Sequence, residues 1–165
     1  MSDDNTNPTG YDAPPYVYAV FNEIGIINQL ATALLAQSLP DGVHPSHFAV
    51  LNHLVRTGDG TTPARIAAAM QVRRNTMTHT LKVLEGRGFI RLARNPDDAR
   101  GKLVFLTGAG HAFRDAAVAQ VLAASSALIG PRESALLARI HDDLVTLRKH
   151  LDANRPAAPG NGEAS

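Results

Sequence analysis

A row of polar and basic side chains recurs along one side of a short predicted helix, residues 74–87. The row consists of Arg74, Asn75, Thr78, His79 and Lys82, and an apolar stripe on another side consists of Met77, Leu81 and Leu84. Arg can donate two parallel hydrogen bonds to guanine, Asn can do the same with adenine, and a Thr methyl can contact a thymine methyl. The stripe would hold the helix on a core and leave these groups outward. This pattern suits a helix in the DNA major groove, whereas a solvated basic face is the simpler interpretation of the helix alone.

Charge around this helix is strongly local. Residues 62–107, here called the basic island, hold nine basic and three acidic side chains, a balance of +6. The complete chain has a net charge of only +1, so the residues outside the island sum to −5. The distribution predicts a localised surface for phosphates.

The island also has a clear order of elements. Thr62 and Pro63 are a hydroxyl cap and a first-turn proline, which predict a helix to Met70. The helix of residues 74–87 follows and ends before Gly88, which suits a left-handed stop. Two strands, residues 89–94 and 102–106, are joined by the turn-rich loop NPDDARG, which we expect to be tipped with Asp98 and Arg100.

The hairpin predicts a second contact with DNA. Such a small hairpin needs one covered face, which alternation assigns to Ile90, Leu92, Val104 and Leu106. An Arg at the tip can enter a narrow, negative minor groove. Asp97 and Asp98 would brace Arg100 by a carboxylate–guanidinium pair. A solvated hairpin turn is the alternative interpretation. It is less favoured because the polar helix directly precedes the hairpin.

Outside the island the periodicity is helical. Helices are expected over residues 16–39, 45–55, 107–129 and from 131 onward, the last with an apolar stripe at Leu136, Ile140, Leu144, Leu147 and Leu151. This stripe fits a dimer interface and an ordinary core face equally well. Residues 1–15 and 154–165 are rich in Pro, Gly, Asn and Ala, and we expect them to be disordered tails.

Composition excludes several classes of function. The chain has no Cys, so disulfides, thiolate metal sites and thiol redox switches are excluded. The N-terminus lacks the pattern of a signal peptide, and no apolar run approaches the roughly 20 residues that span a bilayer, so a cytoplasmic protein without membrane contact is expected. No phosphate-binding Gly-rich loop, nucleophile elbow or carboxylate–His cluster suggests an enzyme, a catalytic residue or a cofactor.

Residues 46–110 resemble the winged helix–turn–helix of the MarR (multiple antibiotic resistance regulator) family. The resemblance rests on HPSHFAVLNHL, TPARIAAAM, RRNTMTHTLKVLEGRGFI and DDARGKLVFLTGAG, and most specifically on Asp98, Arg100, Leu106 and Thr107. With its flanking helices it covers about residues 16–153. The fold it implies is mainly α with a small β-hairpin wing (α+β), a winged helix-turn-helix with N- and C-terminal dimerisation helices.

The resemblance implies a homodimer that binds a pseudo-palindromic double-stranded DNA operator and usually represses transcription. Residues 16–44 and 108–153 would then form the dimerisation helices, and residues 45–107 the DNA-binding domain. The expected DNA contacts are Arg73, Arg74, Asn75, Thr76, Thr78, His79, Lys82, Arg94, Arg100 and Lys102. Two copies would place their recognition helices roughly 34 Å apart. A winged-helix module that binds protein and not DNA is the alternative.

The family also implies a small-molecule effector, aromatic or phenolic by analogy, bound where the dimer helices meet the DNA-binding domain. By position, the candidates for this pocket are Phe21, His44, His47, Phe48 and His111. Two positions depart from the family's pattern: Arg73 stands where the recognition helix usually has a Ser, Thr or Asp cap, and His44 stands where Thr is common before Pro45. Asn75 or a phosphate would then satisfy the first turn. The histidines show no spacing for a metal site.

Overall fold

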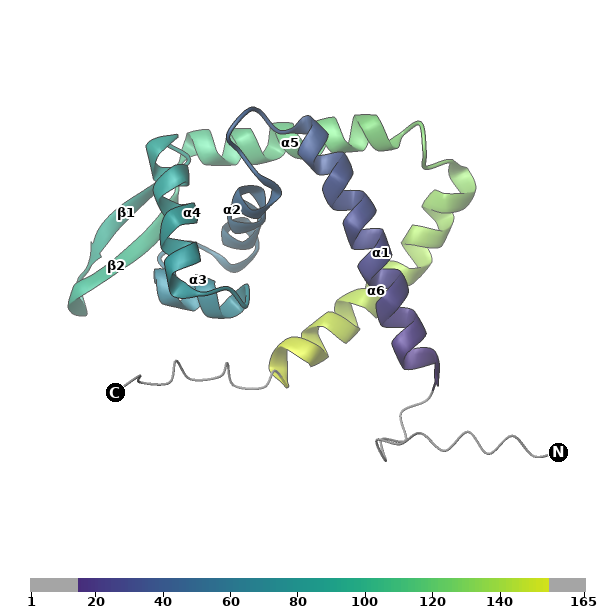
Figure 1. The fold of residues 1–165 in the computed structure, drawn as a ribbon, viewed down its shortest axis with the longest axis horizontal. Helices are drawn as coiled ribbons and strands as arrows, with labels where there is room; N and C mark the ends of the chain where they lie inside the picture. Colours follow the sequence, from purple (N-terminus) through teal and green to yellow (C-terminus); the bar gives the residue numbers. More distant parts are fainter. Residues whose placement is uncertain (1–14, 155–165) are drawn as a thin grey trace.

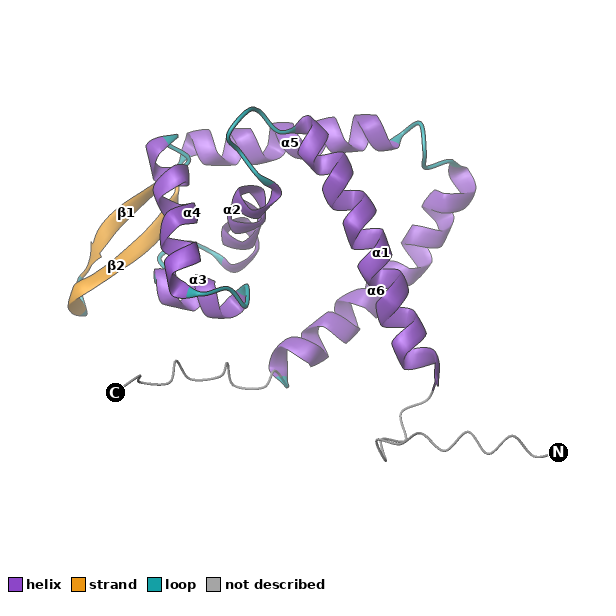
Figure 2. Cartoon of the chain, viewed as in Figure 1, coloured by secondary structure: helices purple, strands orange, loops and turns teal. Residues whose placement is uncertain are grey.

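The computed structural model describes residues 15–154, which form six helices and one two-stranded antiparallel sheet (Figures 1 and 2). In chain order these are α1 (Pro15–Ser38), α2 (Pro45–Thr57), α3 (Pro63–Ala69), α4 (Arg74–Gly86), β1 (Ile90–Asn95), β2 (Asp98–Leu106), α5 (Gly108–Ser125) and α6 (Pro131–Ala153). The predicted class, mainly α with a β-hairpin wing, is confirmed.

Most helix bounds agree with the sequence within a few residues. Helix α1 begins at Pro15, which was expected to lie in the N-terminal tail. Helix α5 ends at Ser125, earlier than the expected Ile129, and a turn leads to the predicted break at Gly130. The two predicted tails otherwise lie outside the described residues.

One apolar core joins α2, α3, α4 and the hairpin. Its buried members are Val50, Leu51, Leu54, Ile66, Ala67, Met77, Leu81, Leu84, Ile90, Val104 and Leu106. The apolar stripe of α4 and three of the four hairpin positions predicted to be covered are therefore buried, and the fourth, Leu92, is partly buried against the core. We call residues 45–107 the reading head, after the role that the sequence predicts for them. This single core holds the elements of the reading head together.

Local capping follows the sequence at most helix ends. The Thr62 hydroxyl accepts a hydrogen bond from the backbone N–H of Arg65 and so caps α3, as predicted. Thr107 caps α5 in the same way by accepting from the N–H of Gly110. Gly88, just after α4, has a φ of 71°, the left-handed conformation that its position predicted.

Hydrogen bonds of Thr107 and one ring contact join the reading head to α5. The Thr107 hydroxyl donates to the carbonyl of Gly88 at 2.6 Å, and the Thr107 N–H donates to that of Phe89 at 3.1 Å. The rings of Phe89 and Phe113 stack with their centroids 4.4 Å apart. Helix α5 therefore leaves the head from a fixed position and runs beyond it toward α6 (Figure 1).

The long helices carry much of the exposed apolar surface. On α1 these side chains include Tyr16, Tyr18, Val20, Phe21, Ile27 and Leu30, and on α6 they include Leu136, Leu137, Leu144 and Leu151. Helix α6 has 23 residues and none of them is buried. An amphipathic helix in water gains little stability without a covered apolar face, so a single chain leaves α6 unsupported.

Helix α1 corrects the expectation about membrane spans. Residues 16–38 contain an 18-residue window with the composition of a spanning helix, with a mean hydropathy of 1.3, and none of that window is buried. A search for uninterrupted apolar runs does not find this helix, because Asn22, Glu23, Asn28 and Gln29 interrupt every run. Those polar groups would lie in hydrocarbon if α1 spanned a bilayer, which is costly. A helix that packs an apolar face on another helix tolerates them on its other side.

Candidate DNA-binding surface

Helix α4 separates its two faces as the sequence predicted. Met77, Leu81 and Leu84 are buried, together with Thr80. All of the residues predicted to contact DNA from this part of the chain are exposed: Arg73, Arg74, Asn75, Thr76, Thr78, His79 and Lys82. The helix is therefore held by one face and presents hydrogen-bond donors and positive charge on the other.

The first turn of α4 shows how the chain compensates for Arg73. Arg73 occupies the N-cap position and its side chain caps no backbone N–H. The Asn75 side-chain oxygen instead accepts from the backbone N–H of Thr76 at 2.8 Å. This agrees with the interpretation that Asn75 replaces the missing cap. It also means that Asn75 must share or leave this bond before it can pair bidentately with adenine.

A groove of about 320 Å³ connects α4 with the wing and the start of α3. It is lined by Thr62, Pro63, Ala64, Arg74, Thr78, Asp98, Gly101 and Lys102. The structure thus brings together Arg74, Thr78 and Lys102, which the sequence placed in two separate elements. The Thr78 hydroxyl donates to the carbonyl of Arg74 at 2.9 Å, which leaves its methyl group available for apolar contact.

The wing differs from its predicted form near the tip. Strand β2 already begins at Asp98, which pairs with Asn95, so the expected loop NPDDARG is wrong and Arg100 lies inside β2. The register shifts between Arg94, which pairs with Lys102, and Asn95, so residues 99–101 form a bulge.

Two local features produce this tight tip. The Asn95 side-chain oxygen accepts from the N–H of Asp97, which closes a short turn at Pro96 and Asp97. Gly101 provides room for the Asp98 carboxylate, because a Cβ at Gly101 would lie 2.9 Å from it. The side chains of Ala99 and Arg100 lie outside the described residues, so the brace between Arg100 and Asp97 or Asp98 remains a prediction.

Both edges of the wing are closed by groups that the sequence analysis did not single out. On one edge, the Asp59 carboxylate accepts from the Leu106 N–H at 2.8 Å, and Val104 bonds to Gly60 and Thr61. On the other edge, the Glu85 carboxylate accepts from the Leu92 N–H at 3.3 Å. These bonds hold the base of the wing on the reading head. The bond of Asp59 spans 47 positions of the chain and so leaves no local signal in the sequence.

Two arginines of the basic island make contacts within the protein. The Arg91 guanidinium lies 4.1 Å from the centre of the Phe105 ring, a cation–π contact. Arg87 donates to the backbone carbonyl of Asp41, in the turn between α1 and α2. Both residues remain exposed, and these contacts hold their guanidinium groups against the protein.

Of the residues proposed for an effector pocket, His47 has the most defined surroundings. It is buried, and its Nδ1 accepts the backbone N–H of His44 at 3.0 Å, one half of a capping box at the start of α2. Burial lowers the pKa of His47, and the neighbouring His44, His79 and Arg87 lower it further. His47 is therefore a neutral structural acceptor.

This arrangement predicts a loss of stability in acid. Because the pKa of His47 is lower in the folded chain than its usual 6.5, the unfolded chain binds the proton first as the pH falls. The free energy of unfolding should be fully retained above about pH 6.5 and decrease below it, by about 1.4 kcal/mol for each unit of pKa difference. Urea titrations at pH 7.5 and 5.5 measure this. His47→Gln keeps an acceptor but cannot be protonated, so an equal acid loss in parent and variant would contradict the assignment.

An open crevice of about 600 Å³ lies where the end of α1 meets α5. It is lined by Gln37, Ser38, Leu39, Pro40, Phe113, Ala116, Ala117 and Gln120. None of the five proposed pocket residues lines it; Phe21, His44 and His111 are exposed, Phe48 is half-buried and His47 is buried in the head. Sequence position indicated the junction of the two parts, but not which helix faces form its walls. Between residues 15 and 154, no three His, Asp or Glu side chains gather in a way that could hold a metal ion.

Comparison with known proteins agrees with this geometry. Residues 41–101 match the MarR family model. Similar solved structures include a MarR-family transcriptional regulator from Rhodococcus sp. RHA1 (20% identity, 82% of this chain and 96% of that chain, TM-score 0.66). Wild-type MarR from E. coli in its apo form is similar as well (23% identity, 81% and 98%, TM-score 0.66). So is CouR from Rhodococcus jostii RHA1 bound to p-coumaroyl-CoA (21% identity, 78% and 90%, TM-score 0.61).

No curated protein sequence matches the chain. At identities of 20 to 23% the solved structures establish a shared fold, and the family model covers the part of the chain that contains α2, α3, α4 and most of the wing. Residues 41–101 therefore match the MarR family, and the chain has the winged helix–turn–helix fold of these structures.

Proposed function

We propose that this protein is a homodimeric regulator that binds double-stranded DNA sequence-specifically and represses transcription until a small molecule releases it. The observation that carries the proposal is the groove that unites the exposed face of α4, the start of α3 and the wing around Arg74, Thr78 and Lys102. Helix α4 would read base edges in the major groove. Arg100, in the bulge beside the wing tip, would enter the adjacent minor groove.

The wing ladder supports a phosphate contact. Arg94 and Lys102 are directly opposed across β1 and β2, and both are exposed. Like charges at opposed positions destabilise a β-ladder, and an anion between or beside them removes that repulsion. A DNA backbone supplies such anions at regular spacing. Arg73 and Lys82 flank the reading residues on α4, where they would make similar contacts that position the protein without selecting a sequence.

The uncovered apolar side chains of the long helices favour dimerisation. Helix α6 has no buried residue in the single chain, and α1 exposes large apolar side chains over most of its length. We propose that a second copy covers both helices, with residues 16–44 and 108–153 forming the dimer and residues 45–107 the DNA-binding domain. A symmetric dimer of this kind reads a pseudo-palindrome. The same apolar face then explains the hydropathy of α1 without a membrane, and the cytoplasm is the expected location.

The crevice between α1 and α5 is the proposed effector site. Phe113 and Leu39 offer apolar surface, while Gln37, Ser38 and Gln120 offer hydrogen-bond partners. An aromatic or phenolic ligand has the corresponding ring and hydroxyl groups. To act as an effector, it must bind more tightly to the state in which the two heads do not fit the operator.

A protein-docking winged helix is the second candidate from the sequence. It requires no opposed cations on the wing and no basic groove beside a polar helix face. The groove around Arg74 and Lys102 therefore favours DNA. An enzyme finds no support in the family, whose similar members are described as transcriptional regulators.

Selection from random duplex DNA, followed by titration of the recovered sequence, tests the proposal. We expect Arg74→Ala to weaken binding by roughly 1–3 kcal/mol, because a bidentate base contact or a phosphate contact is lost. Arg132→Ala is the matched control, since it removes the same charge from an exposed position on α6. Its affinity should remain close to that of the parent. Recovery of no preferred sequence, or equal losses in the two variants, would contradict sequence-specific reading by α4.

A further inference from the structure

The contacts between the reading head and α5 begin at the first turn of that helix and continue along it, through the Phe113 ring on Phe89 and the packing of α2 on α5. Thr107 and Phe89 are bonded there, and a Cβ on Gly110 would lie 2.1 Å from the Phe89 carbonyl oxygen. The bonds of Thr107 fix where α5 begins, whereas the apolar packing farther along has no preferred direction. A hydrogen bond between side chains of α5 and the head is directional and would constrain the angle between them.

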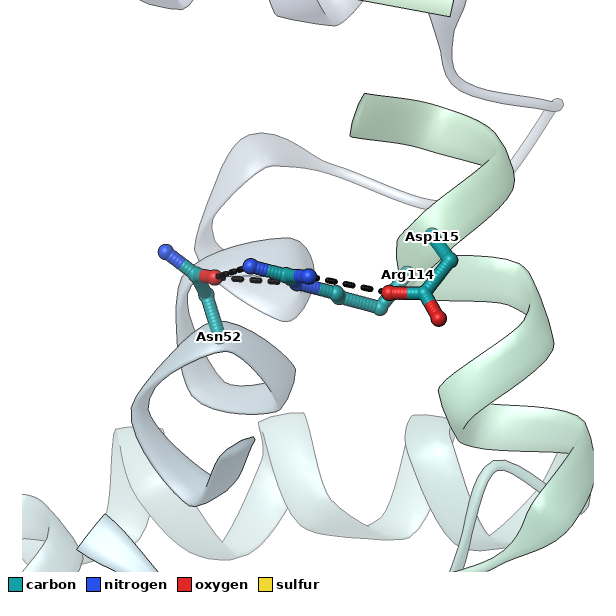
Figure 3. A network of polar contacts seen from close by, with 3 residues as sticks. All are labelled: Asn52, Arg114 and Asp115. Atoms are coloured by element: carbon teal, nitrogen blue, oxygen red, sulfur yellow. Dashed lines mark hydrogen bonds and ion pairs between the residues drawn. The ribbon is translucent and has the colours of Figure 1, made fainter. Parts of the chain in front are cut away.

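Arg114 makes such a contact. It lies seven residues after Thr107, about 10 Å along the helix at 1.5 Å per residue. Its Nε and Nη2 donate to the side-chain oxygen of Asn52 on α2, at 3.1 and 3.0 Å (Figure 3). The contact therefore crosses from the dimerisation helix to the first helix of the reading head.

The remaining arm of the guanidinium is bound within α5. Nη1 donates to the Asp115 carboxylate at 2.9 Å, and Figure 3 shows the guanidinium extended between this carboxylate and Asn52. The Arg114 side chain is only 27% exposed, whereas that of Asp115 is 67% exposed. Arg114 thus has its donors divided between a neighbour on its own helix and a partner on the reading head.

Asn52 is well placed to transmit this contact. Its neighbours Val50, Leu51 and Leu54 are buried in the head core, so α2 cannot shift without the rest of the head. Asn52 itself is exposed on the side of α2 that meets α5. A hydrogen bond to Asn52 therefore links α5 to the reading head as a unit.

We infer that Arg114 is a positioning residue: through Asn52 it fixes the angle of the reading head on α5. In the dimer on which this inference partly rests, that angle sets the separation of the two α4 helices and thus the operator spacing that the protein accepts. The Arg114–Asn52 pair thus acts on the selectivity for operator spacing without contacting DNA.

Distances within one chain test the angle whether or not the protein dimerises or binds DNA. The chain has no Cys, so Ala68→Cys on α3 and Ala119→Cys on α5, both exposed, place two spin labels uniquely. Labelled chains are diluted with excess unlabelled protein so that distances between chains are not counted. With Arg114→Ala or Asn52→Ala, we expect the distance distribution to shift or broaden by about 2 Å or more, the scale of domain movements.

Matched variants distinguish loss of the Arg114–Asn52 contact from a general disturbance of α5. Asp115→Ala removes the contact within α5 and leaves Asn52 bonded, so its distribution should equal that of the parent. The double variant Arg114→Ala/Asn52→Ala should be no broader than either single variant, because both remove the same contact. An unchanged Arg114→Ala distribution, or equal broadening in Asp115→Ala, would overturn the inference. Thermal unfolding of each variant shows that the chains compared are folded.

Operator spacing is the functional readout. The sequence recovered by selection is varied by inserting one or two base pairs between its half-sites. The parent should lose affinity for the altered spacings, and Arg114→Ala should reduce that discrimination by at least about fivefold while retaining its affinity for a single half-site. Equal discrimination in both proteins would overturn the role in spacing. If the parent binds no DNA, the proposed function fails, and the distances within the chain still decide whether Arg114 sets the angle.

Discussion

Gly110→Ala is expected to destabilise the protein, although a Gly→Ala change inside a helix usually stabilises by about 0.5–1 kcal/mol. Gly110 is buried in the first turn of α5. A Cβ there would lie 2.1 Å from the Phe89 carbonyl oxygen and 2.9 Å from a methyl group of Leu106. The first of these neighbours is backbone and cannot rotate away. The start of α5 would have to move away from Phe89, which strains the Thr107 cap, and we expect a net loss of about 1–3 kcal/mol.

Gly108 provides the matched control. It belongs to the same helix turn, and a Cβ on Gly108 would meet nothing within 4 Å. Gly108→Ala should therefore leave the free energy of unfolding unchanged or raise it by up to about 1 kcal/mol. Urea unfolding followed by circular dichroism measures both variants under one condition. If the two substitutions change stability in the same direction, the close approach of α5 to Phe89 is not a determinant of the fold.

The same contrast explains how much of the fold could be predicted from the sequence. Periodicity, the Thr62 and Thr107 caps and Gly88 are local signals, and they located the helices of the reading head to within about two residues. Gly110 carries no local signal, because its requirement comes from a carbonyl 21 positions earlier in the chain. Sequence alone presents Gly108 and Gly110 as equivalent.

The candidate site divides in the same way. The exposed face of α4 was predictable because helical spacing fixes which side chains share a face. The bulge of residues 99–101 was missed, because alternation in Lys102–Leu106 gives no information on where the partner strand shifts register. The supports of the wing, Asp59 and Glu85, were missed because carboxylates that accept backbone N–H groups resemble ordinary surface charges in a sequence.

Leu144→Asp on α6 is expected to have the largest effect on function. Leu144 is 42% exposed in the single chain, and α6 has no buried residue. The substitution should therefore leave the reading head folded. In a dimer that covers the apolar stripe of α6, it would bury an unpaired carboxylate, which costs several kcal/mol for each chain. Since the change occurs twice in a symmetric interface, we expect complete dissociation at micromolar concentration.

Sedimentation or light scattering gives the mass directly, against 17.5 kDa for one chain. We expect twice this mass for the parent and a single-chain mass for Leu144→Asp. Thr146→Asp is the matched control, because it adds the same charge two residues later, about 200° around the helix, at another exposed position. The DNA affinity of Leu144→Asp should be lower than that of the parent, because a monomer contacts only one half-site. Linking two half-site contacts raises affinity by about 10² to 10⁴, and we expect a loss of this size. A parent that already sediments as one chain would disprove the dimer, and a monomeric Leu144→Asp that retains full affinity would show that one reading head suffices.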